Sequence, residues 1–283
     1  MTAGATTPLL PPEVDGLRVS VRVGPPVLGR GYMEAVLDSE IERLEAEQAK
    51  RDDGIHGRVH RVTYQSEANP DNPFGAHQKG QTGLVGRFGL KARIATLDDF
   101  TADAFQGDMG MTSPMRPVEP ANPDGLTDDD KPGVDLSLDS VNQAAFYMRM
   151  LEIPRREGDP GGASLFEEAR CGACHTAALA TRGDYPIALL AGKTVAVYTD
   201  FLLHDMGEEL ADGLVDGDAT GTEWRTAPLI GLRHSPTYMH DGRATTVEEA
   251  ILDHGGEATD SVKRFEALSK ADREALLRFV ESL

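Results

Sequence analysis

The short motif at residues 171–175, Cys-Gly-Ala-Cys-His, constrains this chain more than any other part of its sequence. Its two cysteines are the only ones among 283 residues. A thioredoxin-like dithiol is expected near a βαβ pattern, whereas the stretches around this motif have helical periodicity. A structural zinc site needs further ligands, usually another Cys or His pair at short spacing. C-x-x-C-H is itself the signature of c-type heme attachment, so the motif predicts one covalent heme c.

Each residue of the motif then has a predicted role. The thiols of Cys171 and Cys174 would add to the two heme vinyl groups, and the imidazole of His175 would bind the iron from one side. A methionine on the other side raises the reduction potential, while a second histidine lowers it. Spacing alone does not choose among the candidates, which are Met206, Met239, His204, His234, His240 and His254. If no heme is bound, a disulfide or a free dithiol remains.

Helix-capping patterns and a linker predict the organisation of the chain. Residues 113–136 are rich in Pro and Asp and lack periodicity, which indicates a linker. We expect a mainly α fold, in which a cytochrome c-like helical domain over 137–283 follows a loop-rich region with a few helices over 1–112. Polar residues followed three positions later by an acid predict helix starts, at Ser39 and Glu42, Thr96 and Asp99, Thr246 and Glu249, and Ser269 and Asp272.

The charge and hydropathy of the sequence argue against two classes of partner, nucleic acids and membranes. The formal net charge is −19, and nucleic-acid binding needs Lys and Arg to replace the counterions of the phosphates, so we expect no nucleic acid. No stretch approaches 18 apolar residues, and we therefore expect no membrane span. The opening "MTAGATTPLLPPEVDG" lacks the basic and apolar segments of a secretory signal. Because c-type heme is normally attached outside the cytoplasm, we nevertheless expect a periplasmic protein.

Several other residues have both a heme-related and a structural interpretation. Trp224 would pack beside the heme, lie on an electron path, or serve as an ordinary buried aromatic residue. A heme propionate could pair with a guanidinium, and the candidates are Arg225, Arg233 and Arg243. Carboxylate oxygens suit calcium, and an acidic loop offers three of them, at Asp212, Asp216 and Asp218. We favour a solvated acidic loop over a calcium site as the account of these aspartates.

Three long stretches carry a resemblance to a known family. They are "VGRFGLKARIATLDDFTADAFQGDMGMT", "YTDFLLHDMGEELADG" and "TEWRTAPLIGLRHSPTYMHDGRATTVEEAILDHGGEA". Together they resemble the bacterial diheme oxidoreductases, sometimes called thiol oxidoreductases, which are related to the diheme cytochrome c peroxidases. The similarity runs from about Gly24 to the C-terminus. It implies that His175 is the proximal iron ligand and that His254 leads as distal ligand, ahead of Met239 and Met206.

The chain departs from this family in one respect. Members carry two C-x-x-C-H motifs, the first in an N-terminal heme domain, and this sequence has one. The resemblance implies that residues 1–112 are a remnant of the family's middle region and that the peroxide-reacting heme domain is absent. The leading hypothesis is an electron-transfer protein resembling the relay heme domain, with a redox partner protein that could supply a separate heme domain. The alternatives are a peroxidase or other oxidoreductase acting as half of a split diheme system, and a reading frame that starts late.

Overall fold

The computed structural model describes residue 16 and residues 18–120, 132–156 and 160–283. The middle of the predicted linker, residues 121–131, lies outside the described residues, as do residues 1–15 and 17 of the predicted N-terminal region. The helices are α1 (Arg30–Ala35), α2 (Asp38–Gln48), α3 (Leu97–Met109), α4 (Leu138–Met150), α5 (Ala163–Glu168), α6 (Val247–Leu252), α7 (Thr259–Ala267) and α8 (Lys270–Glu281). The strands are β1 (Arg61–Val62), β2 (Leu84–Val85), β3 (Leu179–Ala180), β4 (Thr194–Val195), β5 (Leu203–Asp205) and β6 (Glu223–Arg225).

The prediction of a mainly α fold is wrong. Helices make up only 36% of the structure and strands 10%, and the strands form three separate antiparallel pairs, β1–β2, β3–β4 and β5–β6. The error lies in residues 176–246, which we had assigned to a helical domain and which contain strands, turns and single 3₁₀ turns. Left-handed residues interrupt this stretch, including Tyr198 (φ 48°) and Phe201 (φ 63°), and an α-helix cannot pass through such a residue.

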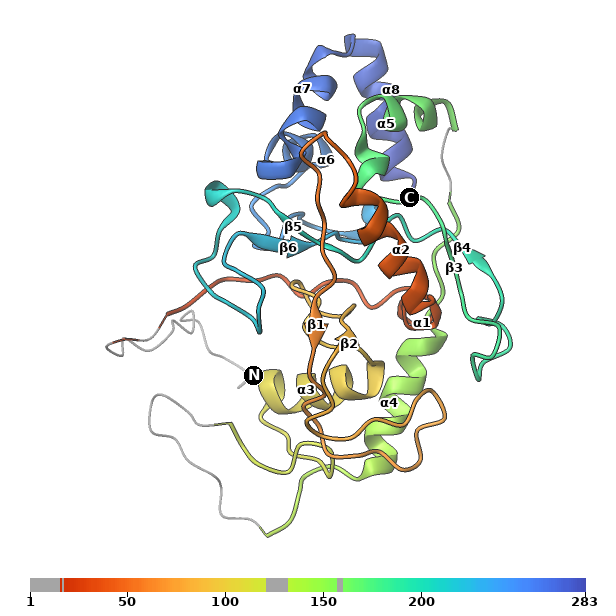
Figure 1. Cartoon of the computed structure of the whole chain (residues 1–283), viewed down its shortest axis with the longest axis vertical. Helices are drawn as coiled ribbons and strands as arrows, with labels where there is room; N and C mark the ends of the chain where they lie inside the picture. Colours follow the sequence, from red (N-terminus) through yellow and green to blue (C-terminus); the bar gives the residue numbers. More distant parts are fainter. Residues whose placement is uncertain (1–15, 17, 121–131, 157–159) are drawn as a thin grey trace, which may run out of the picture.

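The elements are arranged in three zones along the long axis of the molecule (Figure 1). Helices α5, α6, α7 and α8 gather at one end, and α3 and α4 lie at the other. The β5–β6 pair and α2 lie between them. The largest apolar core combines residues from both sides of the predicted linker, for example Phe88 and Leu97 with Val197 and Phe201. The segments before and after residues 113–136 therefore share one core.

A second core lies among the C-terminal helices. Phe166 of α5 packs with Phe265 of α7. Leu276 and Val280 of α8 and the following Leu283 are all buried in this cluster. Since α5 leads directly into the 171–175 motif, the packing of α8 on α5 fixes the approach of the chain to that motif.

Most of the predicted helix starts are confirmed. The side chains of Thr96, Thr246 and Ser269 each accept a hydrogen bond from the backbone three residues later. The start at Ser39 is wrong, because α2 begins at Asp38 and its N-cap Leu37 provides no side-chain acceptor.

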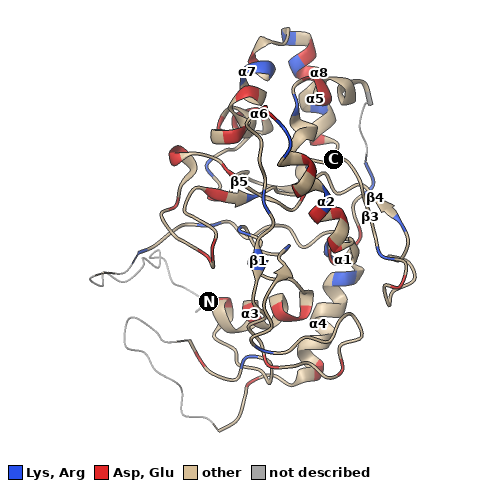
Figure 2. Ribbon diagram, in the orientation of Figure 1, with Lys and Arg blue, Asp and Glu red and all other residues tan. Residues whose placement is uncertain are grey.

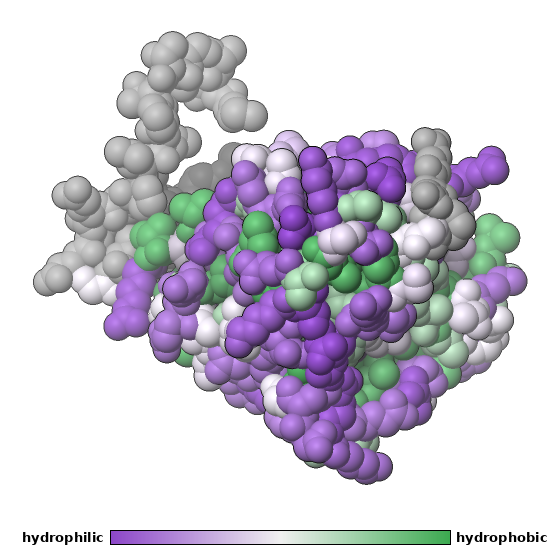
Figure 3. All heavy atoms as spheres, turned by 90° about the horizontal axis from the view of Figure 1, so that it is seen from above, coloured by the Kyte–Doolittle hydropathy of each residue, from purple (hydrophilic) through white to green (hydrophobic). Residues whose placement is uncertain are grey.

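Acidic residues outnumber basic ones in this chain, with 47 Asp and Glu against 28 Lys and Arg. Asp and Glu residues lie on the C-terminal helices as well as on α2 and α3 (Figure 2). Figure 3 views the molecule from the end that the C-terminal helices form. In this view a group of apolar residues lies near the centre, among hydrophilic residues. Within the described part of the chain, no helix is both long enough and apolar enough to cross a membrane.

Candidate functional site

The C-x-x-C-H motif forms a tight turn that ion pairs hold at its entry. Arg170 has a left-handed backbone (φ 64°) directly after α5, and a 3₁₀ turn covers Cys171–Ala173. The guanidinium of Arg170 pairs with Asp53 and lies 3.5 Å from a carboxylate oxygen of Asp260 in α7. The N-terminal part of the chain and the C-terminal helices thus both anchor the motif.

The imidazole of His175 is oriented for metal binding. Its Nδ1 lies 3.1 Å from the backbone oxygen of Tyr198. A carbonyl only accepts hydrogen bonds, so the ring hydrogen is on Nδ1 and the lone pair is on Nε2. Burial and the neighbouring ring of His254 lower the pKa of His175 to about 4. The ring is therefore neutral near pH 7, which is the protonation state that binds a metal.

His254 has the same arrangement on a different element. It follows α6, and its Nδ1 lies 2.6 Å from the backbone oxygen of Ala250 one turn earlier. This hydrogen bond also leaves the lone pair on Nε2. Burial lowers the pKa of the imidazole. The helix that positions His254 is itself fixed by a complete capping box between Thr246 and Glu249.

The two imidazoles are spaced as one iron requires. Their ring centroids are 6.5 Å apart and their planes meet at 59°. One metal ion between two imidazoles separates the ring centroids by roughly 6 Å, because each metal–nitrogen bond is about 2 Å long and each nitrogen lies about 1 Å from its centroid. The distance between the His175 and His254 rings is therefore compatible with one iron bound by both.

The backbones of the two methionine candidates are placed differently, that of Met206 beside the residue that follows His254. Met239 has a left-handed backbone (φ 68°) in the turn between the bridged residues Tyr238 and Ala244. The backbone of Met206 packs against Gly255, at which an added Cβ would lie 2.8 Å from the Met206 oxygen. Among the ring contacts of the described residues, His175 pairs with the ring of His254.

Both cysteines are free thiols, and burial disfavours their thiolate forms. Burial raises the pKa of Cys171 to about 12 and also raises the pKa of Cys174. Catalytic dithiols instead have lowered thiol pKa values that keep the reactive thiolate available. The environment of the motif therefore does not support the redox-dithiol interpretation.

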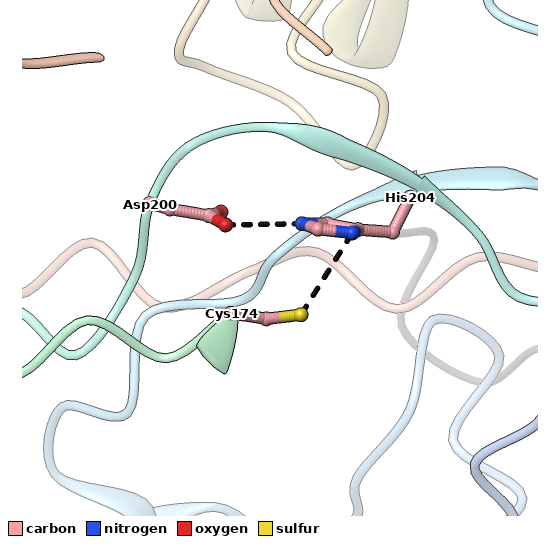
Figure 4. Close-up of side chains that lie close together, drawn as sticks. All are labelled: Cys174, Asp200 and His204. Atoms are coloured by element: carbon pink, nitrogen blue, oxygen red, sulfur yellow. Dashed lines mark hydrogen bonds and ion pairs between the residues drawn. The ribbon is translucent and has the colours of Figure 1, made fainter. Parts of the chain in front are cut away.

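A buried histidine contacts the second cysteine (Figure 4). His204 in β5 places Nδ1 3.7 Å from Sγ of Cys174 and 2.7 Å from a carboxylate oxygen of Glu257, and Nε2 3.0 Å from Asp200. Burial opposes protonation of His204, but Asp200 and the other groups outweigh it and raise its pKa. The sequence placed His204 only among the ligand candidates; its i−4 spacing from Asp200 was the available signal for this contact.

These residues do not form a metal cage. Single atoms of Cys174, Asp200 and His204 lie within 4.8 Å of one another. The cysteine and the aspartate nevertheless contact opposite nitrogens of the ring, so an ion bound to either nitrogen would leave the other ligand on the far side. The geometry is that of a hydrogen-bonded relay.

Trp224 belongs to a separate stack. Its ring stacks nearly parallel to that of His240, with ring centroids 3.8 Å apart. Nζ of the buried Lys91 lies 3.8 Å from the centroid of the Trp224 ring and makes a cation–π contact with it. The indole N–H donates to the backbone oxygen of Leu210 at 2.9 Å. Among the described aromatic contacts, none joins Trp224 of β6 to His175 or His254, and its ring packs against His240 and Lys91.

The arginine candidates differ in their partners. The buried Arg225 donates only to backbone oxygens, of Gly89 at 2.9 Å and of Thr226 at 3.2 Å. Burial lowers the pKa of Arg225 to about 9, and among the described residues no carboxylate pairs with it. Arg243 instead pairs with Asp241 at 2.7 Å, and Arg233 donates to a backbone oxygen.

The three aspartates considered for calcium each face a cation. Asp212 accepts from Arg22, Asp216 lies 3.6 Å from Arg93, and Asp218 lies 3.4 Å from Arg58. Ion pairs thus account for all three carboxylates without a metal ion.

The α6 capping box gives a direct stability prediction. Replacing Thr246 with alanine removes an N-cap acceptor, and we expect the free energy of unfolding to fall by about 1 kcal/mol. Thr246→Ser keeps the hydroxyl and is expected to remain within about 0.5 kcal/mol of the original. Urea unfolding followed by circular dichroism measures both. Equal stability of the alanine and serine variants would contradict this role of the hydroxyl.

Comparison with known proteins gives a family context for this geometry. Residues 9–283 match the family described as "Di-haem oxidoreductase, putative peroxidase". A solved structure of hydrazine synthase from Kuenenia stuttgartiensis, pressurised with xenon, is similar over 100% of this chain and 98% of its own, with 15% identity and a TM-score of 0.41. No curated protein matches the chain significantly.

Proposed function

Because this chain belongs to the di-heme oxidoreductase family, which makes it a heme-binding redox protein, we propose that it holds one covalent c-type heme and relays single electrons. A heme iron supplies this chemistry by alternating between its ferrous and ferric states. The observation that carries the proposal is the 6.5 Å spacing of the His175 and His254 rings.

In this proposal the protein's residues divide the work of holding the heme. Cys171 and Cys174 anchor it through thioether bonds, and His175 and His254 bind the iron through Nε2. The backbone oxygens of Tyr198 and Ala250 keep the two rings oriented by accepting the Nδ1 hydrogens. Such outer hydrogen bonds fix the tautomer and make the ligating nitrogen more basic.

Two histidine ligands favour electron relay over reaction with peroxide. If His175 and His254 both bound the iron, it would keep no open position for a substrate. Both rings are neutral, because burial lowers the pKa of each, so neither is displaced by protonation near pH 7. A second histidine also lowers the reduction potential relative to methionine ligation.

Arg225 is the arginine that we propose as a partner of a heme propionate. A buried charge is costly unless a counter-charge accompanies it, and Arg225 donates only to backbone oxygens. A heme propionate is a carboxylate that a guanidinium can bind with two hydrogen bonds. We therefore assign Arg225 as a propionate partner, in preference to Arg243, which already pairs with Asp241.

Peroxide reactivity tests the relay proposal. The heme-loaded protein is reduced, mixed rapidly with hydrogen peroxide and followed by its absorption spectrum. We expect slow oxidation without catalytic turnover, together with rapid electron exchange with a soluble one-electron mediator. Fast peroxide turnover by the isolated chain would contradict the relay proposal and favour a peroxidase.

A further inference from the structure

Cys174 has a hydrogen-bonding partner that Cys171 lacks. Nδ1 of His204 lies 3.7 Å from Sγ of Cys174. Among the described residues, no side chain hydrogen-bonds Sγ of Cys171, which instead packs against the apolar cluster of the C-terminal helices. The two thiols that the proposed function treats alike therefore differ in their access to a proton-transfer group.

The imidazole beside Cys174 is held firmly from both sides. Asp200 accepts from Nε2 at 3.0 Å, and Glu257 accepts at Nδ1 at 2.7 Å. Because a carboxylate only accepts, this arrangement places a hydrogen on each ring nitrogen. His204 is 2% exposed and Asp200 is fully buried.

The carboxylate of Asp200 is in turn fixed by the surrounding backbone and side chains. Gln48 of α2 donates to its Oδ2 at 2.8 Å, and the backbone N–H of Leu202 donates to its Oδ1 at 3.0 Å. The same Gln48 amide group lies 3.2 Å from the backbone oxygen of Ala173, inside the motif. The relay is thus tied directly to the turn that carries Cys174.

We propose that His204, supported by Asp200, transfers the proton when Cys174 forms its thioether bond to the heme. This inference rests on the proposed covalent heme. In the step, the S–H bond of Cys174 breaks and its sulfur bonds to the inner carbon of a vinyl group. The outer vinyl carbon gains one hydrogen from Nδ1 of His204, and the thiol hydrogen replaces it on the ring. The addition is balanced and needs no oxidant or reductant.

The alternative role of a nucleophilic cysteine is less well supported by the geometry. A Cys–His–Asp relay also serves acyl transfer, which needs space for a substrate beside Sγ. Two surface cavities lie away from Cys174, one lined by Phe74, Phe146 and Arg149 and the other by Tyr32 and Arg156. Thioether formation needs no separate substrate, because the reacting vinyl group belongs to the heme that His175 would hold beside this thiol.

The test compares the two thiols within one molecule. The full-length apoprotein is incubated with ferrous heme b under anaerobic conditions, and samples are denatured and treated with iodoacetamide at intervals. Peptide mass spectrometry then reports how fast each thiol becomes protected. In His204→Gln we expect protection of Cys174 to slow by about 100-fold, a typical contribution of general acid–base catalysis, while Cys171 reacts at its original rate.

Two further variants keep the test interpretable if His204→Gln folds poorly. Asp200→Asn retains a similar shape but removes the supporting charge, and Gly57→Ala would place a Cβ 2.5 Å from Cε1 of His204. Both are expected to slow Cys174 selectively. His60→Gln is the matched control, because His60 is also 2% exposed but contacts Lys91 and Asp218, and both thiols should react normally.

Three results would overturn the inference. Protection of Cys174 at its original rate in His204→Gln would show that the relay is not used. Equal slowing of both thiols in all three variants would show that His204 has no effect specific to Cys174. If neither thiol of the unsubstituted protein becomes protected, the proposed covalent heme fails first and this inference fails with it, which distinguishes the two failures.

Discussion

Replacement of His254 with alanine is expected to convert the heme iron from six-coordinate low-spin to high-spin with an open position. His254 is the residue whose ring faces His175 at the iron-compatible spacing of 6.5 Å. Its removal leaves the proximal ligand and both thioether anchors unchanged, so the heme should stay attached. Absorption and electron paramagnetic resonance spectra of the oxidised protein measure the spin state.

Added imidazole gives this prediction a chemical control. Because the alanine variant opens space on the side of His254, free imidazole should bind there and restore the low-spin spectrum. His234→Ala, which removes an exposed histidine, is expected to leave the spectrum unchanged. A low-spin spectrum of His254→Ala without imidazole would show that another residue, such as Met206 or Met239, is the distal ligand.

Replacement of Arg149 with methionine is expected to lower the free energy of unfolding by about 3–5 kcal/mol, the usual effect of removing one member of a buried ion pair. Arg149 of α4 is 2% exposed and pairs with Glu34 at 2.6 Å and with Asp98. Burial favours the neutral form of Glu34, yet Arg149 lowers the pKa of this carboxyl below its usual value. Without the guanidinium, two buried carboxyl groups lose their shared counter-charge.

An exposed arginine provides the comparison for this stability measurement. Arg43 pairs with Glu40 and Glu47 on the surface of α2, and such pairs contribute at most about 1 kcal/mol. Arg43→Met is therefore expected to unfold at nearly the original urea concentration. If Arg149→Met were equally stable, the buried network would not be holding α4 to the segment that contains Glu34.

Local sequence patterns predicted the helix starts that depend on residues close together in the sequence. Thr246 and Ser269 start helices because a hydroxyl three positions before a free N–H can accept its hydrogen bond. Residues 176–246 could not be assigned in this way, because their strands of two or three residues are too short to show an alternating pattern and their left-handed turns include ordinary residues such as Tyr198. Neither feature leaves a periodic signal.

In the candidate site, too, the sequence indicated the residues that are close together in the chain but not the contacts between distant ones. The motif at 171–175 identified both thiols and His175, since their spacing is local. The proximity of His254 to His175 depends on how α6 packs at the end of the molecule, and sequence spacing could not separate it from Met206 or Met239. The contact between His204 and Cys174 joins residues 30 positions apart, so only the folded chain reveals it.

The heme content of the purified chain tests the central claim most directly. The protein is expressed with a heme c attachment system, extracted with acidified acetone and analysed as its pyridine hemochrome. The account predicts one heme per chain that resists extraction and has a c-type spectrum, and it predicts that Cys171→Ser combined with Cys174→Ser abolishes this attachment. Heme that extracts completely, or a chain that binds none, would contradict it.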